Sequence, residues 1–353
     1  MEMKTYRFAI IGTGAIANIH AQAIQEIDNA VLIGAYNRTP EKAAVFAQKW
    51  NCQLYPTLEE LLAEELDVIC ICTASGLHLP AALQSIQAAK HVLIEKPLEI
   101  TAERCEQIAQ AAIQQGVKVG VIFPSRFNSS SQRIKQALQA NRFGKLVMGS
   151  AYVKWSRDAA YYASAPWRGT WEFDGGGALM NQAIHSVDLL QWYMGPVKSV
   201  QAIAANIRHK DIEVEDTVVA IIRFESGALG SIECTTATFP GSFKRVEIHG
   251  TQGTAVLEEN TIKSWQFTDE TAQDKQIQNQ TNNQSTQGGF ADPMDIAYLG
   301  HKHQIVDFLT AIANSTTPLV DAAEGKKSVE IIEAIYKSAK TGMEVFLKPE
   351  EAI

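Results

Sequence analysis

The residues best suited to chemistry begin with a lysine that follows a short apolar run. The run His91–Ile94 is typical of a buried strand, and Glu95-Lys96-Pro97 comes directly after it. The carboxyl ends of strands in an open α/β sheet face the crevice where such sheets bind ligands. An ammonium there can donate a hydrogen bond to a reacting oxygen, so Lys96 is predicted to be catalytic. The alternative is a surface lysine in a turn.

A glycine-rich turn near the N-terminus predicts the second part of a site. Gly12-Thr13-Gly14-Ala15-Ile16-Ala17 follows an apolar strand and opens a helical pattern. Two glycines allow a tight turn and a close approach of the backbone to a pyrophosphate, which then binds at the helix N-terminus. The strand before and the helix after the motif favour this interpretation over a purely structural turn.

The end of the second predicted strand bears on which dinucleotide would bind. A site that prefers NAD places Asp or Glu there, on the ribose 2′-hydroxyl. This chain has Asn37-Arg38-Thr39 instead. An uncharged residue followed by a guanidinium can accept a 2′-phosphate, which favours NADP. The alternative is that Arg38 stacks on the adenine without selecting a phosphate.

A third candidate lies in a predicted helix that follows three consecutive glycines. Asn181 and His185 are four residues apart and share one helix face. Asp188 could hydrogen-bond the imidazole and fix its tautomer. His185 is therefore a candidate general base, although a lone helical histidine is more often structural.

Two further segments contain residue types that suit ligand contacts. Tyr161 with Tyr162, and Trp167 with Arg168, combine aromatic faces that suit rings with arginines that suit carboxylate or phosphate. The alternative is a loop packed on its own domain. His301-Lys302-His303 resembles a metal-binding fragment, but no third ligand is near it in sequence, and no metal is expected.

The elements that must position these residues indicate an α/β protein of two domains. Up to about residue 125, short apolar strands alternate with helices, which predicts a doubly wound parallel sheet, a Rossmann domain over 1–125. Longer alternating segments then predict a domain over 126–353 with a large, mainly antiparallel open sheet. The C-terminal helices could pack back on the first domain. Residues 268–289, rich in Gln, Asn and Thr, are predicted to form an exposed loop.

Composition excludes several classes of protein. The 353 residues are 46% hydrophobic and 20% charged, with a formal net charge of -8 and no basic block, so nucleic acid and anionic membranes are not expected partners. The five cysteines lack disulfide or metal-ligand spacing. No apolar run reaches about 20 residues and no signal peptide precedes the first strand, so a cytoplasmic location is expected.

Taken together, these motifs resemble the Gfo/Idh/MocA oxidoreductases over nearly the whole chain. The resemblance rests on the Gly12–Ala17 turn, Glu95-Lys96-Pro97, Arg126-Phe127, the segment from Gly175 to Asp188, and Gly300-His301. It implies a Rossmann domain followed by a domain whose open sheet commonly forms the oligomer interface, hence a homodimer or homotetramer. It also implies hydride transfer between NAD(P) and a ring carbon of a sugar, cyclitol or nucleotide sugar.

The resemblance also assigns roles to residues. Lys96 and His185 match the catalytic lysine and histidine, and both are expected to reach one substrate hydroxyl. The implied substrate contacts are Asn181, Asp188, Arg126, Tyr161 and Arg168. The implied cofactor contacts are Gly12, Gly14, Ala15, Ile16, Asn37, Arg38, Thr73, Ala74, His78, Glu95, Lys96 and Trp167.

One position departs from the family pattern. Many members carry Asp where this chain has Asn181, which puts the proton path in doubt. Met180-Asn181-Gln182 and the upstream aromatic segments resemble the nucleotide-sugar branch, which includes UDP-N-acetyl-2-amino-2-deoxyglucuronate 3-dehydrogenases. The alternatives are a reductase of a non-sugar carbonyl, similar to dihydrodiol dehydrogenase, and a non-catalytic NAD(P)-dependent sugar sensor. Retention of both Lys96 and His185 favours catalysis.

Overall fold

A computed structural model describes residues 4–281 and 298–348 of the chain. The chain forms two compact units. The first consists of Met1–Pro124 and Ala297–Lys326, and the second of Ser125–Ile296 and Lys327–Ile353. The first unit is therefore built from two stretches that are far apart in the sequence.

The first unit contains a parallel six-stranded sheet in the order β3-β2-β1-β4-β5-β6, the doubly wound order of dinucleotide-binding folds. The strands are β1 Tyr6–Ile11, β2 Ala30–Tyr36, β3 Gln53–Leu54, β4 Val68–Ile71, β5 His91–Ile94 and β6 Val119–Val121. The helices between them are α1 Ala15–Gln25, α2 Pro40–Trp50, α3 Leu58–Leu62, α4 His78–Gln87 and α5 Ala102–Gln115.

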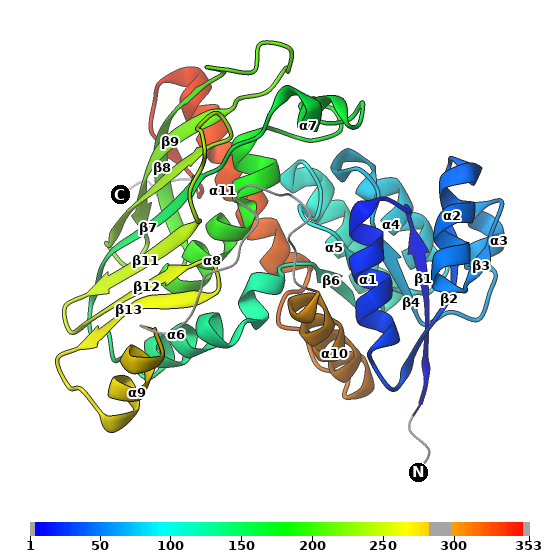
Figure 1. Cartoon of the computed structure of the whole chain (residues 1–353), viewed down its shortest axis with the longest axis horizontal. Coiled ribbons are helices and arrows are strands. Elements are labelled where there is room, and N and C mark those ends of the chain that lie inside the picture. Colours follow the sequence, from blue (N-terminus) through cyan, green and yellow to red (C-terminus); the bar gives the residue numbers. More distant parts are fainter. Residues whose placement is uncertain (1–3, 282–297, 349–353) are drawn as a thin grey trace. The chain divides into compact units, whose positions relative to one another are not determined.

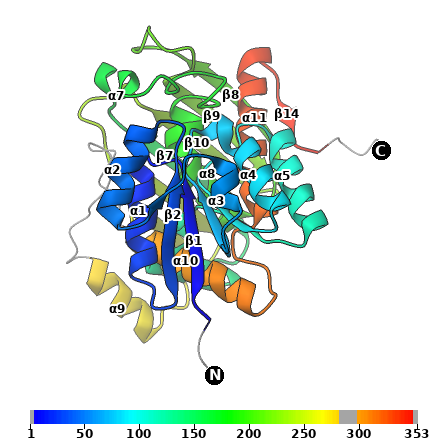
Figure 2. The ribbon, with the colours of Figure 1, turned by 90° about the vertical axis from the view of Figure 1, so that its right-hand side faces the viewer.

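Helices cover both faces of this sheet. In Figure 2, α1 and α2 lie to one side of β1 and β2, and α4 and α5 lie to the other. The helix α10, Leu299–Ala313, comes from far along the chain and packs on α1, adding Phe308 to the core around Phe8 and Ile24. Burial on both faces explains why β1 and β4 are almost continuously apolar.

Local signals in the sequence set the ends of two helices. Thr101 accepts a hydrogen bond from the N–H of Arg104 at the start of α5, and Gly116 ends that helix in the left-handed region, at φ 69°. Thr57 likewise caps α3 by accepting from the N–H of Glu60. Such caps satisfy N–H groups that have no partner inside the helix.

The second unit is built on an eight-stranded sheet in the order β13-β12-β11-β7-β10-β9-β8-β14 (Figure 1). All neighbouring pairs are antiparallel except β7 with β10. The strands are β7 Leu146–Lys154, β8 Val197–Ala205, β9 Thr217–Phe224, β10 Leu229–Thr235, β11 Arg245–Gly250, β12 Gly253–Glu258, β13 Thr261–Phe267 and β14 Val345–Phe346.

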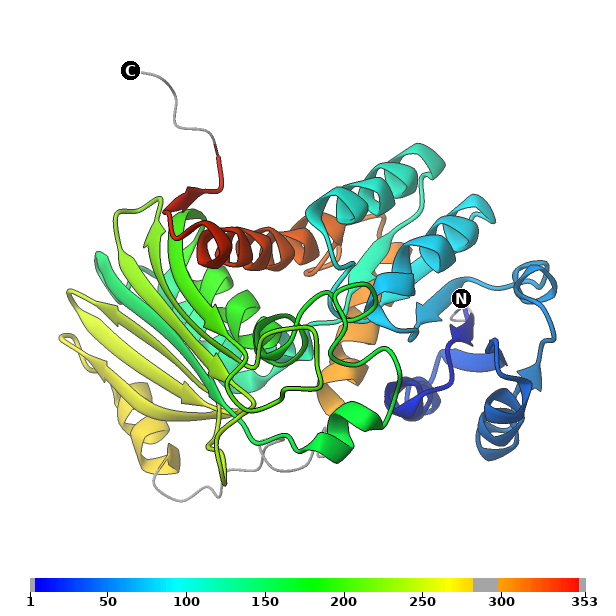
Figure 3. The ribbon, with the colours of Figure 1, turned by 90° about the horizontal axis from the view of Figure 1, so that it is seen from above.

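Helices of this unit cover one face of the sheet. They include α6 Ser129–Gln139, α8 Ile184–Met194 and much of α11, Ala322–Thr341; Figure 3 shows α8 in green and α11 in red on the same side of the strands. Residues along β9 alternate between buried and exposed, as expected for a sheet covered on one face. On the other face Ile203, Val219, Ile221 and Leu229 are exposed.

The prediction of a loop over residues 268–289 is wrong for residues 272–281. Ala272–Thr281 forms the helix α9, because Asp274 gathers enough partners to order a polar segment. Both terminal nitrogens of Arg142 donate to the Asp274 carboxylate at 2.7 and 2.8 Å, and the indole N–H of Trp265 donates at 2.7 Å. Residues 282–289 lie outside the described residues.

The structure leaves all five cysteines as free thiols, and four of them are buried. Within 4–281 and 298–348, no helix is both long enough and apolar enough to cross a membrane.

Candidate active site

The glycine turn joins β1 to α1 and leaves room for a ligand. Gly12 has φ +89°, and a Cβ there would lie 2.7 Å from the carbonyl oxygen of Cys72, so only glycine fits. Gly14 precedes α1, and the space where its Cβ would point is open. No side chain caps the helix, which leaves the N–H groups of its first turn available to an anion.

The surroundings of this turn fit a dinucleotide. The side-chain amide of Asn37, just after β2, donates to the hydroxyl of Thr13 at 2.8 Å, which ties the two loops together. Arg38 beside it is exposed. After β4, the buried hydroxyl of Thr73 has no hydrogen-bond partner among the described residues. The Gly12–Ile16 turn would hold a pyrophosphate, Asn37 and Arg38 would face a ribose, and Thr73 offers an unused polar group.

The segment Glu95-Lys96-Pro97 follows β5 and lies at the same edge of the sheet as Cys72 and Thr73. His78 at the start of α4 donates from Nδ1 to the carbonyl oxygen of Pro97 at 2.8 Å, and its Nε2 lies 3.3 Å from the carbonyl oxygen of Thr73. Burial lowers the pKa of His78 and so opposes a charge on the ring. His78 therefore braces the loop behind Lys96, a contact that the sequence did not indicate.

In the second unit, the segment that carries Asn181 and His185 is not a regular α-helix throughout. Ala178–Ala183 is a π-helix, and α8 begins at Ile184. π-helical segments are rare in proteins, and those that occur often lie at functional sites. The buried carboxylate of Glu215 accepts the N–H groups of Gly177 and Leu179, each at 2.8 Å. A Cβ on Gly177 would overlap the Glu215 backbone, which explains the glycine there.

Asn181 stands in a hydrogen-bonded network that no single motif predicted. Its side-chain nitrogen donates to the buried carboxylate of Asp174, and its oxygen accepts from Gln182 at 2.6 Å. The same Gln182 nitrogen lies 2.7 Å from the hydroxyl of Tyr161. These bonds orient the Asn181 amide and connect it to the aromatic segment upstream.

That aromatic segment presents arginines stacked on rings. The Arg168 guanidinium lies 4.3 Å from the centre of the Tyr161 ring and 4.6 Å from that of Trp167, and its Nη1 donates to the Tyr161 hydroxyl at 2.6 Å. Arg157 lies 5.3 Å from the same Tyr161 ring and donates to Gln182. Tyr161, Trp167, Arg168 and Asn181 are thus parts of one cluster.

Arg126 and Asp188 lie elsewhere in the second unit. Both side chains are completely buried, and Arg126 donates through Nε and Nη2 to the two carboxylate oxygens of Asp188 at 2.9 and 2.7 Å. The sequence predicted direct substrate contacts for both, and a partner for His185 in Asp188. The bidentate pair holds α8 to the segment that precedes α6, and the predicted substrate contacts and the His185–Asp188 contact stay predictions.

The structure therefore gathers the predicted residues into two groups, one in each unit. The first contains the glycine turn, Asn37, Thr73, His78 and the segment Glu95-Lys96-Pro97. The second contains Tyr161, Arg168 and Asn181, and His185 follows four residues later in α8. Sequence reasoning missed His20, Asp174 and Glu215. Asp174 precedes three glycines and His20 lies among alanines and isoleucines, which was an available signal, whereas Glu215 lies among other charged residues and gave none.

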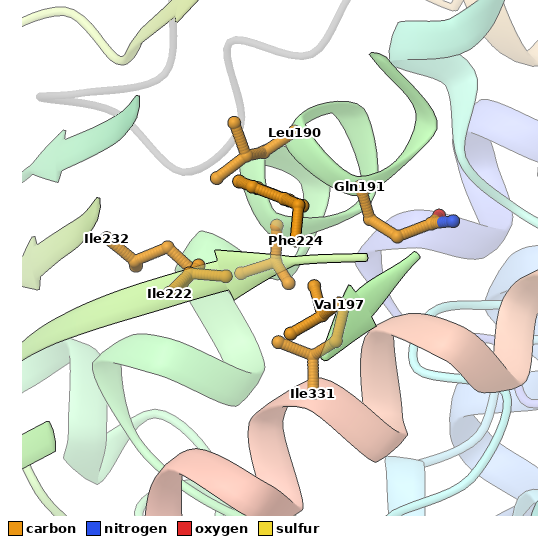
Figure 4. A pocket seen from close by; sticks show the side chains of 8 residues that line it. Leu190, Gln191, Val197, Ile222, Phe224, Ile232 and Ile331 are labelled. Carbon is orange, nitrogen blue, oxygen red and sulfur yellow. The ribbon is translucent and has the colours of Figure 1, made fainter. Parts of the chain in front are cut away.

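A pocket in the second unit has a different character. It lies between α8, the sheet and α11, and seven of its eight lining residues are apolar (Figure 4). Leu190 comes from α8, Phe224 from the sheet and Ile331 from α11, and the space does not admit a water molecule. We regard it as a packing gap in the core.

The doubly wound sheet, the open glycine turn and the lysine after β5 define a nicotinamide-dependent oxidoreductase. Two family models match the chain: the oxidoreductase family with an NAD-binding Rossmann fold over residues 6–123, and the GFO/IDH/MocA C-terminal domain over residues 131–256. The chain belongs to the Gfo/Idh/MocA family, as the sequence predicted, and is an oxidoreductase with an NAD-binding Rossmann fold.

Individual relatives agree with this assignment. Inositol 2-dehydrogenase of Rhizobium meliloti is 29% identical over 261 residues, which cover 72% of this chain and 76% of the relative. The WlbA dehydrogenase of Bordetella pertussis, solved with NADH and UDP-GlcNAcA, is 32% identical with a TM-score of 0.89, covering 99% of this chain and 100% of that one. WlbA of Chromobacterium violaceum, with the same ligands, is 34% identical with a TM-score of 0.88, covering 99% and 98%.

Glu215 leads to a prediction about pH and stability. Burial raises the pKa of Glu215 to about 7 from its ordinary value of 4.5. Between these values the folded protein binds more protons than the unfolded chain, so the free energy of unfolding must fall as pH rises from 4.5 to 7. The Glu215→Gln variant lacks this titration. Relative to it, the parent should lose about 3 kcal/mol across the window, measured by urea unfolding at a series of pH values.

The exposed Glu225→Gln variant is the control and should keep the parent's pH profile. A difference between the parent and Glu215→Gln that stays constant from pH 4.5 to 7 would contradict the prediction.

Proposed function

We propose that this chain is a dehydrogenase of a nucleotide sugar that carries a carboxylate, of the kind represented by UDP-GlcNAcA. The observation that carries the proposal is the Arg168–Tyr161 stack beside Asn181. A guanidinium held against an aromatic ring is well placed to pair with a carboxylate next to a sugar ring. The 32% and 34% identity with the two WlbA enzymes over almost the whole chain supports the same substrate class.

The proposed chemistry assigns separate tasks to two side chains. When bound, the nicotinamide accepts or gives the hydride of a ring carbon at its C4 atom. Lys96 donates a hydrogen bond to the oxygen of that carbon and stabilises it as the bond order to carbon changes. His185 takes the hydroxyl proton in oxidation and returns it in reduction, so hydride and proton leave the alcohol together.

Asn181 is proposed to orient the substrate rather than to carry charge. The family's commoner carboxylate is missing at this position, but Asp174 supplies one directly behind it by accepting from the Asn181 amide. Because Asp174 fixes which end of the amide is oxygen, the Asn181 oxygen is presented to other donors, as its bond from Gln182 shows.

The first test is turnover. Incubation with UDP-GlcNAcA and either NADP or NAD should produce the reduced cofactor, followed by absorbance, and simple sugars, inositol and a dihydrodiol should react more slowly. Lys96→Met and His185→Ala should each lower kcat by about 10²–10⁴-fold with little change in the Kd for NADH, because positioned proton transfer contributes that much. Asn181→Asp should shift the pH profile without abolishing turnover.

The exposed residues Lys42 and His303 provide matched controls. Lys42→Met and His303→Ala should keep the parent's kcat. Full activity in Lys96→Met or His185→Ala would exclude the proposed roles, and a preference for the dihydrodiol would move the substrate class to non-sugar carbonyls.

We also propose that Arg38 makes the site favour NADP. The support is the lack of a carboxylate at Asn37 and the exposure of the Arg38 guanidinium, while the two WlbA structures, which hold NADH, argue the other way. Arg38→Ala should weaken the affinity for NADPH more than that for NADH, because only NADPH has a 2′-phosphate with which the Arg38 guanidinium can pair. Fluorescence titration measures both; equal losses, or tighter binding of NADH by the parent, would contradict the preference.

Finally, we propose a homo-oligomer formed through the uncovered face of the second unit's sheet. Ile203 is 76% exposed and lies opposite Val219, which is 51% exposed, on the neighbouring strand; Ile221 and Leu229 extend the apolar face. Contiguous apolar surface of this kind is typical of an interface. A charge there should oppose association: light scattering should give a dimer or tetramer for the parent and a lower mass for Ile203→Glu.

The matched control is Ile113→Glu on α5, where an isoleucine is equally exposed but isolated on a helix. This variant should keep the parent's mass. A monomeric parent at micromolar concentration would exclude the oligomer.

A further inference from the structure

The first unit contains a buried cluster of ionisable groups next to the proposed catalytic lysine. Glu95, directly after β5, meets His20 from α1 and His301 from α10. The Nε2 atom of His20 lies 2.8 Å from Oε1 of Glu95, and that of His301 lies 3.6 Å from the same oxygen. Side-chain exposure is 0% for His20, 8% for Glu95 and 3% for His301, so solvent contributes little to this cluster.

The second carboxylate oxygen of Glu95 has a separate task. Oε2 accepts the backbone N–H of Lys96 at 3.2 Å, while the backbone N–H of Glu95 itself donates to the carbonyl oxygen of Ile71 at the end of β4. One carboxylate thereby joins the helix that follows the glycine turn, the returning helix α10 and the backbone of Lys96.

The charges of the cluster suit a proton-bound pair. Burial by itself would raise the pKa of Glu95, but hydrogen bonds from His20 and His301 hold it well below its ordinary value. Burial also opposes protonation of His20, yet the nearby sulfurs of Cys72 and Cys70 and the Glu95 carboxylate raise its pKa well above the usual range. Burial lowers the pKa of His301. The two directions fit a proton held between His20 and Glu95, whose Nε2 and Oε1 atoms lie 2.8 Å apart.

A metal ion is the other occupant that these three residues could hold, since their ligand atoms lie within 4.8 Å of one another. Two ligands of a tetrahedral zinc, bound at about 2.0–2.1 Å, would be about 3.3 Å apart. The 2.8 Å between His20 and Glu95 is instead an ordinary hydrogen-bond distance. The geometry favours a shared proton.

We propose that Glu95, held by His20 and His301, is a positioning residue that places Lys96 for the dehydrogenase reaction. This inference rests on the proposed function of Lys96. An ammonium must meet a particular oxygen, and a displacement of about 1 Å at a reacting group can lower the rate by about 10²-fold. The buried pair fixes the Lys96 backbone from behind, where no substrate contact is needed.

Glu95→Gln is the variant that tests this role. Glutamine keeps the shape but has a single acceptor oxygen, so one of the donors from His20, His301 and Lys96 loses its partner. We expect kcat to fall by about 10- to 100-fold, and the Kd for NADH is measured alongside to separate this loss from a change in cofactor binding. Hydrogen exchange of the Lys96 backbone N–H should become faster, and Glu95→Asp should restore part of both properties.

Glu99→Gln is the matched control in the same unit. Glu99 is also a buried carboxylate, and it receives hydrogen bonds from the N–H groups of Leu79 and Ile100 and from Arg104. Its loss should lower the free energy of unfolding without lowering kcat or changing exchange at Lys96. A merely structural role for Glu95 would give the same pattern as Glu99, and that result would overturn the proposal.

Three further outcomes are decisive. If the parent oxidises no sugar, the proposed function is wrong. Hydrogen exchange of the Lys96 backbone N–H then still tests whether Glu95 positions Lys96: faster exchange in Glu95→Gln supports this role, and unchanged exchange contradicts it. If Glu95→Gln does not fold, His301→Gln removes only the longer contact and should show a smaller loss of kcat in the same direction; unchanged kcat would count against the proposal. Stoichiometric zinc in the purified protein, measured by elemental mass spectrometry, would replace the proton-bound pair with a metal site.

Discussion

A buried carboxylate needs hydrogen-bond donors nearby, and this requirement fixes the positions of chain segments in both units. The cost of an isolated buried charge is several kcal/mol, so each such group draws fixed chain segments around it. Glu95 collects His20, His301 and the Lys96 backbone; Glu215 collects the N–H groups that begin the π-helix; Asp188 collects Arg126. Each carboxylate lies behind a segment proposed to act on the ligand, and the apolar core supplies the dry surroundings that make each pairing strong.

Much of this fold could be predicted because it depends on local rules. Alternating short apolar strands and helices indicated the parallel sheet, and alternation in the second half indicated a sheet with one covered face. Thr101 and Gly116 marked the ends of α5 because a cap and a left-handed residue act within one turn of the helix. The glycine turn could be recognised for the same reason, since a tight backbone approach requires glycine.

The parts that escaped prediction depend on partners distant in sequence. Residues 272–281 have a loop-like composition, yet Asp274 orders them through Arg142, 132 residues earlier. The buried ion pair of Arg126 and Asp188 was not predicted, because the two residues lie 62 positions apart in the sequence. The Asp174 carboxylate behind Asn181 lies only seven residues away, but a π-helix and a glycine loop intervene, and no periodicity relates the two positions.

Because the first unit contains Ala297–Lys326, it cannot be completed until the whole intervening segment has been synthesised. Pro124 and Ala297 are separated by 172 residues, which a ribosome adds in roughly 10–35 s at about 5–20 residues/s. Throughout that interval Phe8 and Ile24 lack Phe308, and Gln304 has yet to bond the backbone of Phe123. The N-terminal part of the nascent chain therefore exposes an apolar surface that only α10 covers. This surface is a binding site for chaperones until α10 has been synthesised.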